Sequence, residues 1–222
     1  MNAMLNRENG GIDRGDWYRR VEVSFGQRLY DGTVNLHLVC YGPLLSSGNK
    51  AKPENKNAIR AAFAPQIQAQ AIRNLMSVQV PLDGLSVVAV GKHRFLPLIT
   101  KDLSLVVDID ALVLSPEPPT GARPDRGDVD GRTKTFMDAL RIAKVDELKK
   151  WPVSDDPINC LLEDDSLVKD KHVRQGRLLA PFEDTRGVPL WQYRKDDTLL
   201  IIDVTVRATE VTDRNRGFLG IG

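Results

Sequence analysis

Residues 103–113 carry the strongest constraint on the fold, because apolar side chains alternate strictly with other residues along them. Every second position from Leu103 to Val113 is apolar, and Asp108 and Asp110 lie between these positions. This period of two predicts a strand with one face in a core and the other toward solvent. The two aspartates form an Asp-x-Asp pair, but the alternation assigns both to the solvent face. We therefore expect them to play no part in catalysis.

The other periodic segments place two helices and five more strands around this strand, in the order βαβββαββ. We expect a hairpin within 170–197, and a first helix that is interrupted or kinked at Pro65. The order lacks the regular alternation of a doubly wound parallel sheet. It predicts an α+β fold, a mixed β-sheet with helices packed on one face. The expected strands are 34–40, 85–90, 95–100, 103–113 and 198–208, together with 160–170, an apolar run that three acids interrupt before it resumes as a strand. The expected helices are 55–75 and 133–150.

Composition excludes several classes of protein. A chain of 222 residues with 41% hydrophobic content suits one sizeable globular domain. Lys and Arg number 31 against 30 Asp and Glu, so any basic surface must be local. No apolar run is long enough to span a bilayer and no signal sequence is visible, so we expect a soluble, cytoplasmic protein without a membrane partner. Cys40 and Cys160 belong to no CxxC pair, which predicts two buried thiols rather than a zinc site or a disulfide.

An acidic motif, RPDRGDVDGRTKTFMDALR, combines carboxylates with a lysine. Asp128 and Asp130 are two residues apart, and Lys134 and Asp138 follow at four-residue steps. Residues two apart share a face only in an extended segment. The two aspartates can therefore converge on one ion if the helix starts at or just after Gly131, with Asp130 as its N-cap. Along that helix Asp130, Lys134 and Asp138 would form one ionic edge, drifting by about 40 degrees per step.

Several interpretations of this motif were weighed. A structural one gives an N-cap and two salt bridges within the helix, each worth about 0.2–0.5 kcal/mol. An EF-hand loop is excluded, because its first and twelfth positions would be Arg126 and Met137, which cannot supply the required oxygen ligands. A haloacid-dehalogenase-type phosphatase has similar Asp-x-Asp-Gly-x-Thr sequences. There the motif closes an apolar strand, whereas here it follows the polar ARPDRG.

A second acidic segment favours a metal site. Glu163, Asp164 and Asp165 interrupt the apolar run of LLEDDSLV, where a turn normally needs one acid. If folding brings this segment against Asp128 and Asp130, the site offers oxygen ligands and leaves positions free for water and phosphate. Such a set suits a hard divalent cation, Mg²⁺ in the first place and Mn²⁺ as the alternative.

Together these motifs resemble the RusA family of Holliday-junction resolvases, the crossover-junction endodeoxyribonucleases. The resemblance covers 123–140 and 163–168, and the flanking strands and first helix agree in order. It implies a single RusA-like nuclease domain over 33–222, with insertions near 141–160 and 170–197. Residues 1–32 would be an N-terminal extension, peripheral or poorly ordered.

The resemblance also implies roles for individual residues. Asp128, Asp130 and Asp165 would be the catalytic carboxylates that bind magnesium, and Lys134 the catalytic lysine. Asp138 would lie on the helix surface or support the lysine, and Asp164 would be a neighbour of the site.

The expected function is Mg²⁺-dependent, structure-selective endonuclease activity on branched DNA such as four-way junctions. Arg123, Arg126 and Arg132 bracket the acids and are expected to bind DNA, because an acidic cluster alone would repel phosphates. Symmetric cutting of a four-way junction needs two sites about a twofold axis, which predicts a homodimer. Two alternatives stay open: a DNA-binding protein of the same fold without efficient cleavage, and a haloacid-dehalogenase-type phosphatase.

Overall fold

The computed structural model describes residues 34–46, 53–76, 86–116, 129–178 and 197–219. The N-terminal extension predicted over 1–32 lies outside these ranges. The described elements, in chain order, are β1 (Val34–Pro43), α1 (Pro53–Met76), β2 (Val88–Val90), β3 (His93–Ile99), η3 (Lys101–Leu103), β4 (Leu105–Ser115), α2 (Val129–Leu140), η4 (Val145–Leu148), β5 (Ile158–Leu162), η5 (Asp165–Leu167), β6 (Val168–Arg177), β7 (Asp197–Ala208) and α3 (Arg216–Leu219).

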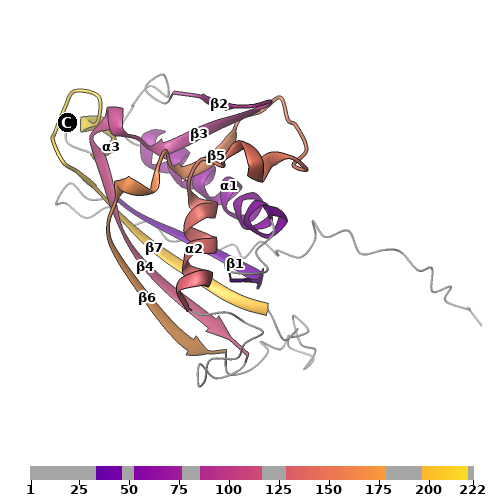
Figure 1. Cartoon of the computed structure of the whole chain (residues 1–222). Coiled ribbons are helices and arrows are strands. Elements are labelled where there is room, and N and C mark those ends of the chain that lie inside the picture. The colour runs from indigo at the N-terminus through magenta and orange to yellow at the C-terminus, as the bar shows by residue number, and fades with distance from the viewer. Residues whose placement is uncertain (1–33, 47–52, 77–85, 117–128, 179–196, 220–222) are drawn as a thin grey trace, which may run out of the picture.

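The described strands form two mixed sheets, where the sequence predicts one (Figure 1). The larger has the order β1-β7-β4-β6, with β4 and β6 parallel and the other pairs antiparallel. The smaller has the order β2-β3-β5, with β3 and β5 parallel. Between β3 and β4 the short helix η3 redirects the chain, so consecutive strands enter different sheets. The α+β class is confirmed, and the single sheet is corrected to two.

Strand β4 confirms the alternation that the sequence shows. Asp108 and Asp110 lie on the opposite face of the sheet from the core and form ion pairs there. Asp110 contacts Arg174 of β6, with 3.0 Å between Oδ1 and Nη2, and Asp108 contacts Arg207 of β7. These contacts support a structural role for this Asp-x-Asp pair. The core face of the strand consists of Leu105, Val107, Ile109, Ala111 and Val113.

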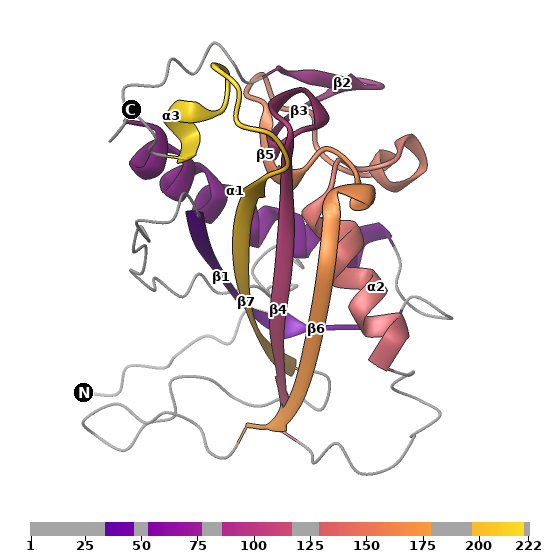
Figure 2. The ribbon, with the colours of Figure 1, turned by 90° about the vertical axis from the view of Figure 1, so that its left-hand side faces the viewer.

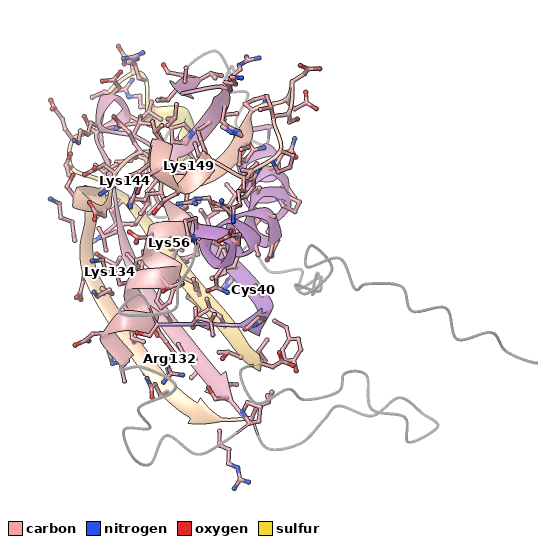
Figure 3. All side chains as sticks on the ribbon, turned by 45° about the vertical axis from the view of Figure 1, so that its right-hand side comes forward. Cys40, Lys56, Arg132, Lys134, Lys144 and Lys149 are labelled. Atoms are coloured by element: carbon pink, nitrogen blue, oxygen red, sulfur yellow. The ribbon has the colours of Figure 1, made fainter. Side chains whose placement is uncertain are left out.

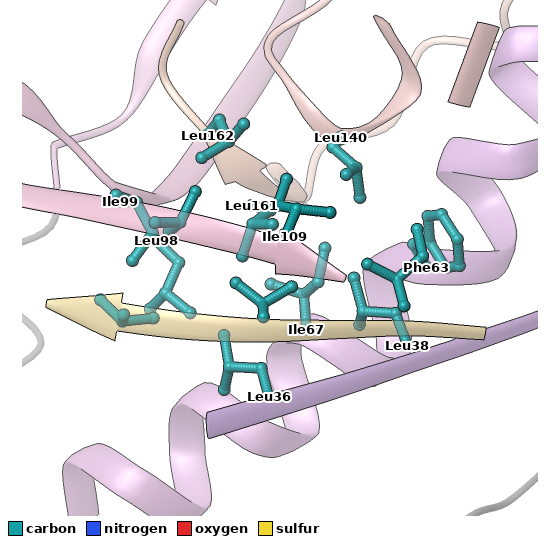
Figure 4. Packing of buried hydrophobic residues seen from close by; sticks show 14 of the residues in the cluster. Leu36, Leu38, Phe63, Ile67, Leu98, Ile99, Ile109, Leu140, Leu161 and Leu162 are labelled. Atoms are coloured by element: carbon teal, nitrogen blue, oxygen red, sulfur yellow. The ribbon is translucent and has the colours of Figure 1, made fainter. Parts of the chain in front are cut away.

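Both long helices lie on the same face of the larger sheet, behind its strands in Figure 2. The buried residues of α1 recur every four positions, which gives this helix one apolar face toward the sheet. The helix continues across Pro65, so the predicted interruption is absent. The core between helix and sheet includes Leu36, Leu38, Ile59, Phe63, Ile67, Ala71, Ile109 and Leu140 (Figure 4).

Two glutamines of α1 hydrogen-bond the free edge of β1, which is the first strand of the larger sheet. The Gln66 amide accepts from Val39 N at 2.9 Å and donates to Val39 O at 2.8 Å. The Gln70 amide likewise accepts from His37 N at 2.8 Å and donates to His37 O at 2.6 Å. The helix thus satisfies backbone groups that an edge strand otherwise leaves open to another chain.

The second long helix, α2, is shorter than the predicted helix 133–150. It begins at Val129 and ends at Leu140, because the next residues leave the helix to pair with β5. Arg141 forms a parallel bridge with Leu162, and Ile142 N donates to Leu162 O at 3.0 Å. The chain then forms the short helix η4.

The remaining predictions have mixed outcomes. Residues 168–177 form β6, which runs parallel to β4, and the rest of the hairpin predicted within 170–197 lies largely outside the described residues. Cys40 and Cys160 are free and buried, as predicted, and burial raises the pKa of both thiols to about 12. Among the described helices, none has the length and apolar character needed to cross a membrane.

Candidate functional site

A groove of about 600 Å³ lies between α2 and the segment that joins β5 to β6. It contains residues of both acidic segments, which are far apart in the sequence. Asp130 of the first acidic segment and Asp165 of the second thus lie on the same groove. The groove is lined by Asp130, Thr133, Lys134, Met137, Asp138, Asp165, Ser166, Val168, Lys169, Asp170 and Lys171.

Helix α2 presents Asp130 and Lys134 to this groove. Both side chains are exposed, whereas Phe136 and Leu140 are fully buried and fix the opposite side of the helix in the core. The hydroxyl of Thr135 donates to Leu45 O at 2.8 Å and ties the helix to the end of the first strand region. Because the helix begins at Val129, Asp130 lies in its first turn and is not the N-cap that the sequence predicts.

Lys134 forms no ion pair within the described part of the chain, which corrects the predicted ionic edge (Figure 3). Asp138, one turn further along, is buried and directed elsewhere. Its carboxylate accepts from Lys56 Nζ at 2.6 Å and from Arg141 Nη2 at 2.8 Å. Lys134 is therefore a cation on the groove wall whose charge no residue of α2 neutralises. Asp138 is buried and does not lie on the helix surface.

Asp138 belongs to a buried charged network that joins α1, α2 and η4. At its centre is Glu147, whose carboxylate contacts Lys56 Nζ at 2.8 Å and Arg60 Nη2 at 2.7 Å. Arg60 is 1% exposed and also donates to Asp138 O at 2.6 Å. Every charge in this network has an opposite partner, and the contacts hold the end of α2 against α1 behind the groove.

The network shifts the acidity of its members. Burial by itself raises the pKa of Glu147, but hydrogen bonding from Lys56 and the charge of Arg60 outweigh it, and the pKa is lowered. Burial also raises the pKa of Asp138, but the hydrogen bonds from Lys56 and Arg141 outweigh this effect, and the pKa is lowered. Both carboxylates are thus held ionised by their partners.

The three consecutive acids after β5 have separate tasks. The Glu163 carboxylate accepts from Lys101 N at 2.9 Å, at the start of η3. The Asp164 carboxylate caps η5, accepting from Ser166 N at 3.0 Å. Hydrogen bonding from the side chain of Ser166, together with that from its backbone N–H, lowers the pKa of Asp164. Asp165 is exposed and faces the groove. The structure thus gives two of the acids local structural partners and leaves the predicted ligand Asp165 at the groove.

Three predicted site residues, Arg123, Arg126 and Asp128, lie outside the described residues. Arg132 is half-exposed in the first half of α2, beyond the groove lining. Among the described residues, no three His, Cys, Asp or Glu side chains are grouped so that they could hold a metal ion. The predicted ligand Asp128 is next to Val129 in the sequence, and its position relative to Asp130 and Asp165 lies outside the described ranges.

Sequence reasoning missed Lys169 and Lys171, which line the groove from β6. Their signal was present in VKDKHV, where two lysines two residues apart follow the second acidic segment. The register of β6 against β4 shifts between Val168 and Asp170, and both lysines line the groove without the regular alternation of a strand.

No protein-family model, curated protein or solved structure matches this chain.

Proposed function

We propose that the chain is a Mg²⁺-dependent endodeoxyribonuclease that hydrolyses phosphodiester bonds in branched DNA such as four-way junctions. One observation carries the proposal. Two carboxylates from separate acidic segments, Asp130 and Asp165, line one groove together with Lys134, which no acid of the described chain neutralises. A RusA-like arrangement requires this combination, and a helix with a local salt bridge does not.

The donor set fits a hard cation. Asp130 and Asp165 offer only carboxylate oxygens and are exposed, and Asp128 would complete the set. Bound Mg²⁺ or Mn²⁺ would activate a water molecule and polarise the phosphate for in-line attack. Lys134, on the same groove wall as Asp130, would offset the negative charge that develops on the phosphoryl oxygens. Arg123, Arg126 and Arg132 would attract the DNA backbone around the acids.

The substrate bears on the assembly. Two nicks placed symmetrically in a four-way junction require two grooves related by a twofold axis, so the active form would be a homodimer. Its concentration-dependent assembly can be followed by sedimentation.

The decisive experiment compares two neighbouring aspartates. Asp165→Asn should lower junction cleavage in Mg²⁺ by about a hundredfold or more, because it removes a ligand charge from the groove. Asp164→Asn is the matched control, since Asn also caps helices well and the side chain keeps its bond to Ser166. Cleavage of a labelled four-way junction, with and without EDTA, is the measurement.

Three results would overturn the proposal in different ways. Equal activity of the two variants would remove Asp165 from the site. A wild-type protein that binds junctions but never cuts them would be the non-cleaving DNA-binding alternative. Rapid hydrolysis of small phosphomonoesters with inert DNA would instead indicate a phosphatase.

A further inference from the structure

The groove has a second wall, formed by the first half of β6. Lys169 and Lys171 line it from this side, opposite Lys134 of α2. On the outer face of the same strand, His172 and Arg174 contact Asp110 at 3.5 and 3.0 Å. These two residues have a carboxylate partner there, whereas Lys169 and Lys171 lie on the groove.

The groove lysines have no acidic partner within the described ranges. Lys134, Lys169 and Lys171 are all exposed and form no ion pair there, although Asp130, Asp165 and Asp170 line the same groove. Three ammonium groups from two elements therefore face one cavity with their charges available. A ligand that carries several separated negative charges would satisfy them, and a single small anion would not reach both walls.

We infer that Lys169 and Lys171 bind backbone phosphates of the DNA strand held in this groove, on the side opposite α2. The inference rests on the proposed function and deepens it, because it names a second wall of the substrate site. Lys134 would act at the phosphate that reacts, and the two β6 lysines would hold phosphates beside it. They would position the strand without taking part in bond cleavage.

A simpler explanation exists for lysines at this place. Among the described strands β6 pairs with β4 alone, and lysines on an edge strand hinder pairing with other chains. That role predicts greater self-association when the lysines are lost and leaves DNA binding unchanged. The position of both lysines on the groove, facing Lys134, favours the phosphate-binding role, and the two explanations differ in one measurable quantity.

The test is the salt dependence of junction binding by the full-length protein, measured in EDTA so that no cleavage occurs. Each phosphate contact contributes about 0.9 to the slope of log K against log salt concentration on duplex DNA. The double variant Lys169→Gln/Lys171→Gln should lower this slope by about 1 to 2 between roughly 50 and 200 mM salt. The corresponding double change to Arg should keep the slope, because it keeps both charges.

A matched control removes two charges elsewhere. Lys92→Gln/Lys149→Gln changes two exposed lysines away from this groove and should leave the slope within error of wild type. An unchanged slope in the Lys169/Lys171 variant, with more self-association, would overturn the inference in favour of edge protection. If wild type binds junctions without cutting them, the nuclease proposal fails while the slopes still decide the lysines. If wild type binds no DNA, both are overturned.

Discussion

At the scale of single residues, substitution of Lys134 distinguishes a role on the helix surface from a role in catalysis. Because its side chain is exposed and forms no ion pair in the described chain, Lys134→Ala should change the free energy of unfolding by less than about 0.5 kcal/mol. The same change should slow junction cleavage by about a hundredfold. Lys134→Arg should recover only part of the rate, since a planar guanidinium places its donors differently. Thermal unfolding and single-turnover cleavage on one preparation measure both effects, and a fully active alanine variant would remove the lysine from the site.

Glu147 should dominate the acid sensitivity of the fold. Its carboxyl has a lowered pKa, so the stability it contributes is complete above its ordinary value of 4.5 and is lost as the pH falls through the lower folded value. Glu147→Gln leaves Arg60, 1% exposed, without its carboxylate and should cost about 3–5 kcal/mol. The loss of stability as the pH falls below the ordinary pKa of 4.5 should also be shallower in this variant.

Glu54→Gln is the control for that measurement, because Glu54 forms a surface ion pair with Lys150, whose side chain is 80% exposed. It should cost less than about 1 kcal/mol and leave the pH dependence as in wild type. Urea unfolding at several pH values gives both quantities. Identical slopes for the Glu147 and Glu54 variants would show that the network does not control acid stability.

At the scale of elements, the contacts between α1 and β1 can be tested through their glutamines. Gln66→Ala and Gln70→Ala each remove a donor and an acceptor from the strand edge, and each should cost about 1–3 kcal/mol. Gln68→Ala, an exposed change on the same helix, should be nearly neutral. Equal stability of the Gln66 and Gln68 variants would mean that water replaces the amide at the edge without loss.

The helices and strands also show how much of the fold the sequence predicts. The alternation of 103–113 predicts β4, which spans Leu105–Ser115, because every second side chain is buried in the core while Asp108 and Asp110 lie on the other face. The end of α2 was not predictable, because Arg141 and Ile142 leave the helix to pair with Leu162, which is remote in the sequence. The apolar pattern continues through this point, and pairing with β5 overrides it.

For the site, the sequence was informative about residue types and less so about their partners. Spacing singled out Asp130 and Lys134, the family resemblance selected Asp165 among three consecutive acids, and all three line the groove. Spacing also paired Lys134 with Asp138, whereas the structure gives Asp138 to Lys56 of another helix and to Arg141. Local periodicity detects neighbours along one element, and contacts between elements depend on packing that no short pattern contains.

At the scale of the whole molecule, the order of the strands could not be predicted from the sequence. Nothing in the pattern of 34–43 or 197–208 indicates that they pair with each other, or that the chain divides its strands between two sheets. Both sheets contain a parallel pair, and such pairs require crossovers whose path depends on the three-dimensional fit of α1 and α2.

The position of β7 has a consequence for how the molecule forms. The last strand of the larger sheet lies in its middle, between β1 and β4, and it pairs Val34 with Val206. During synthesis the edges of β1 and β4 that pair with β7 remain unpaired until residues 197–208 have emerged. Closing so long a loop makes such folding slow, and the waiting strands are exposed to aggregation. The interval before β7 arrives is the time at which a newly made chain most needs a chaperone.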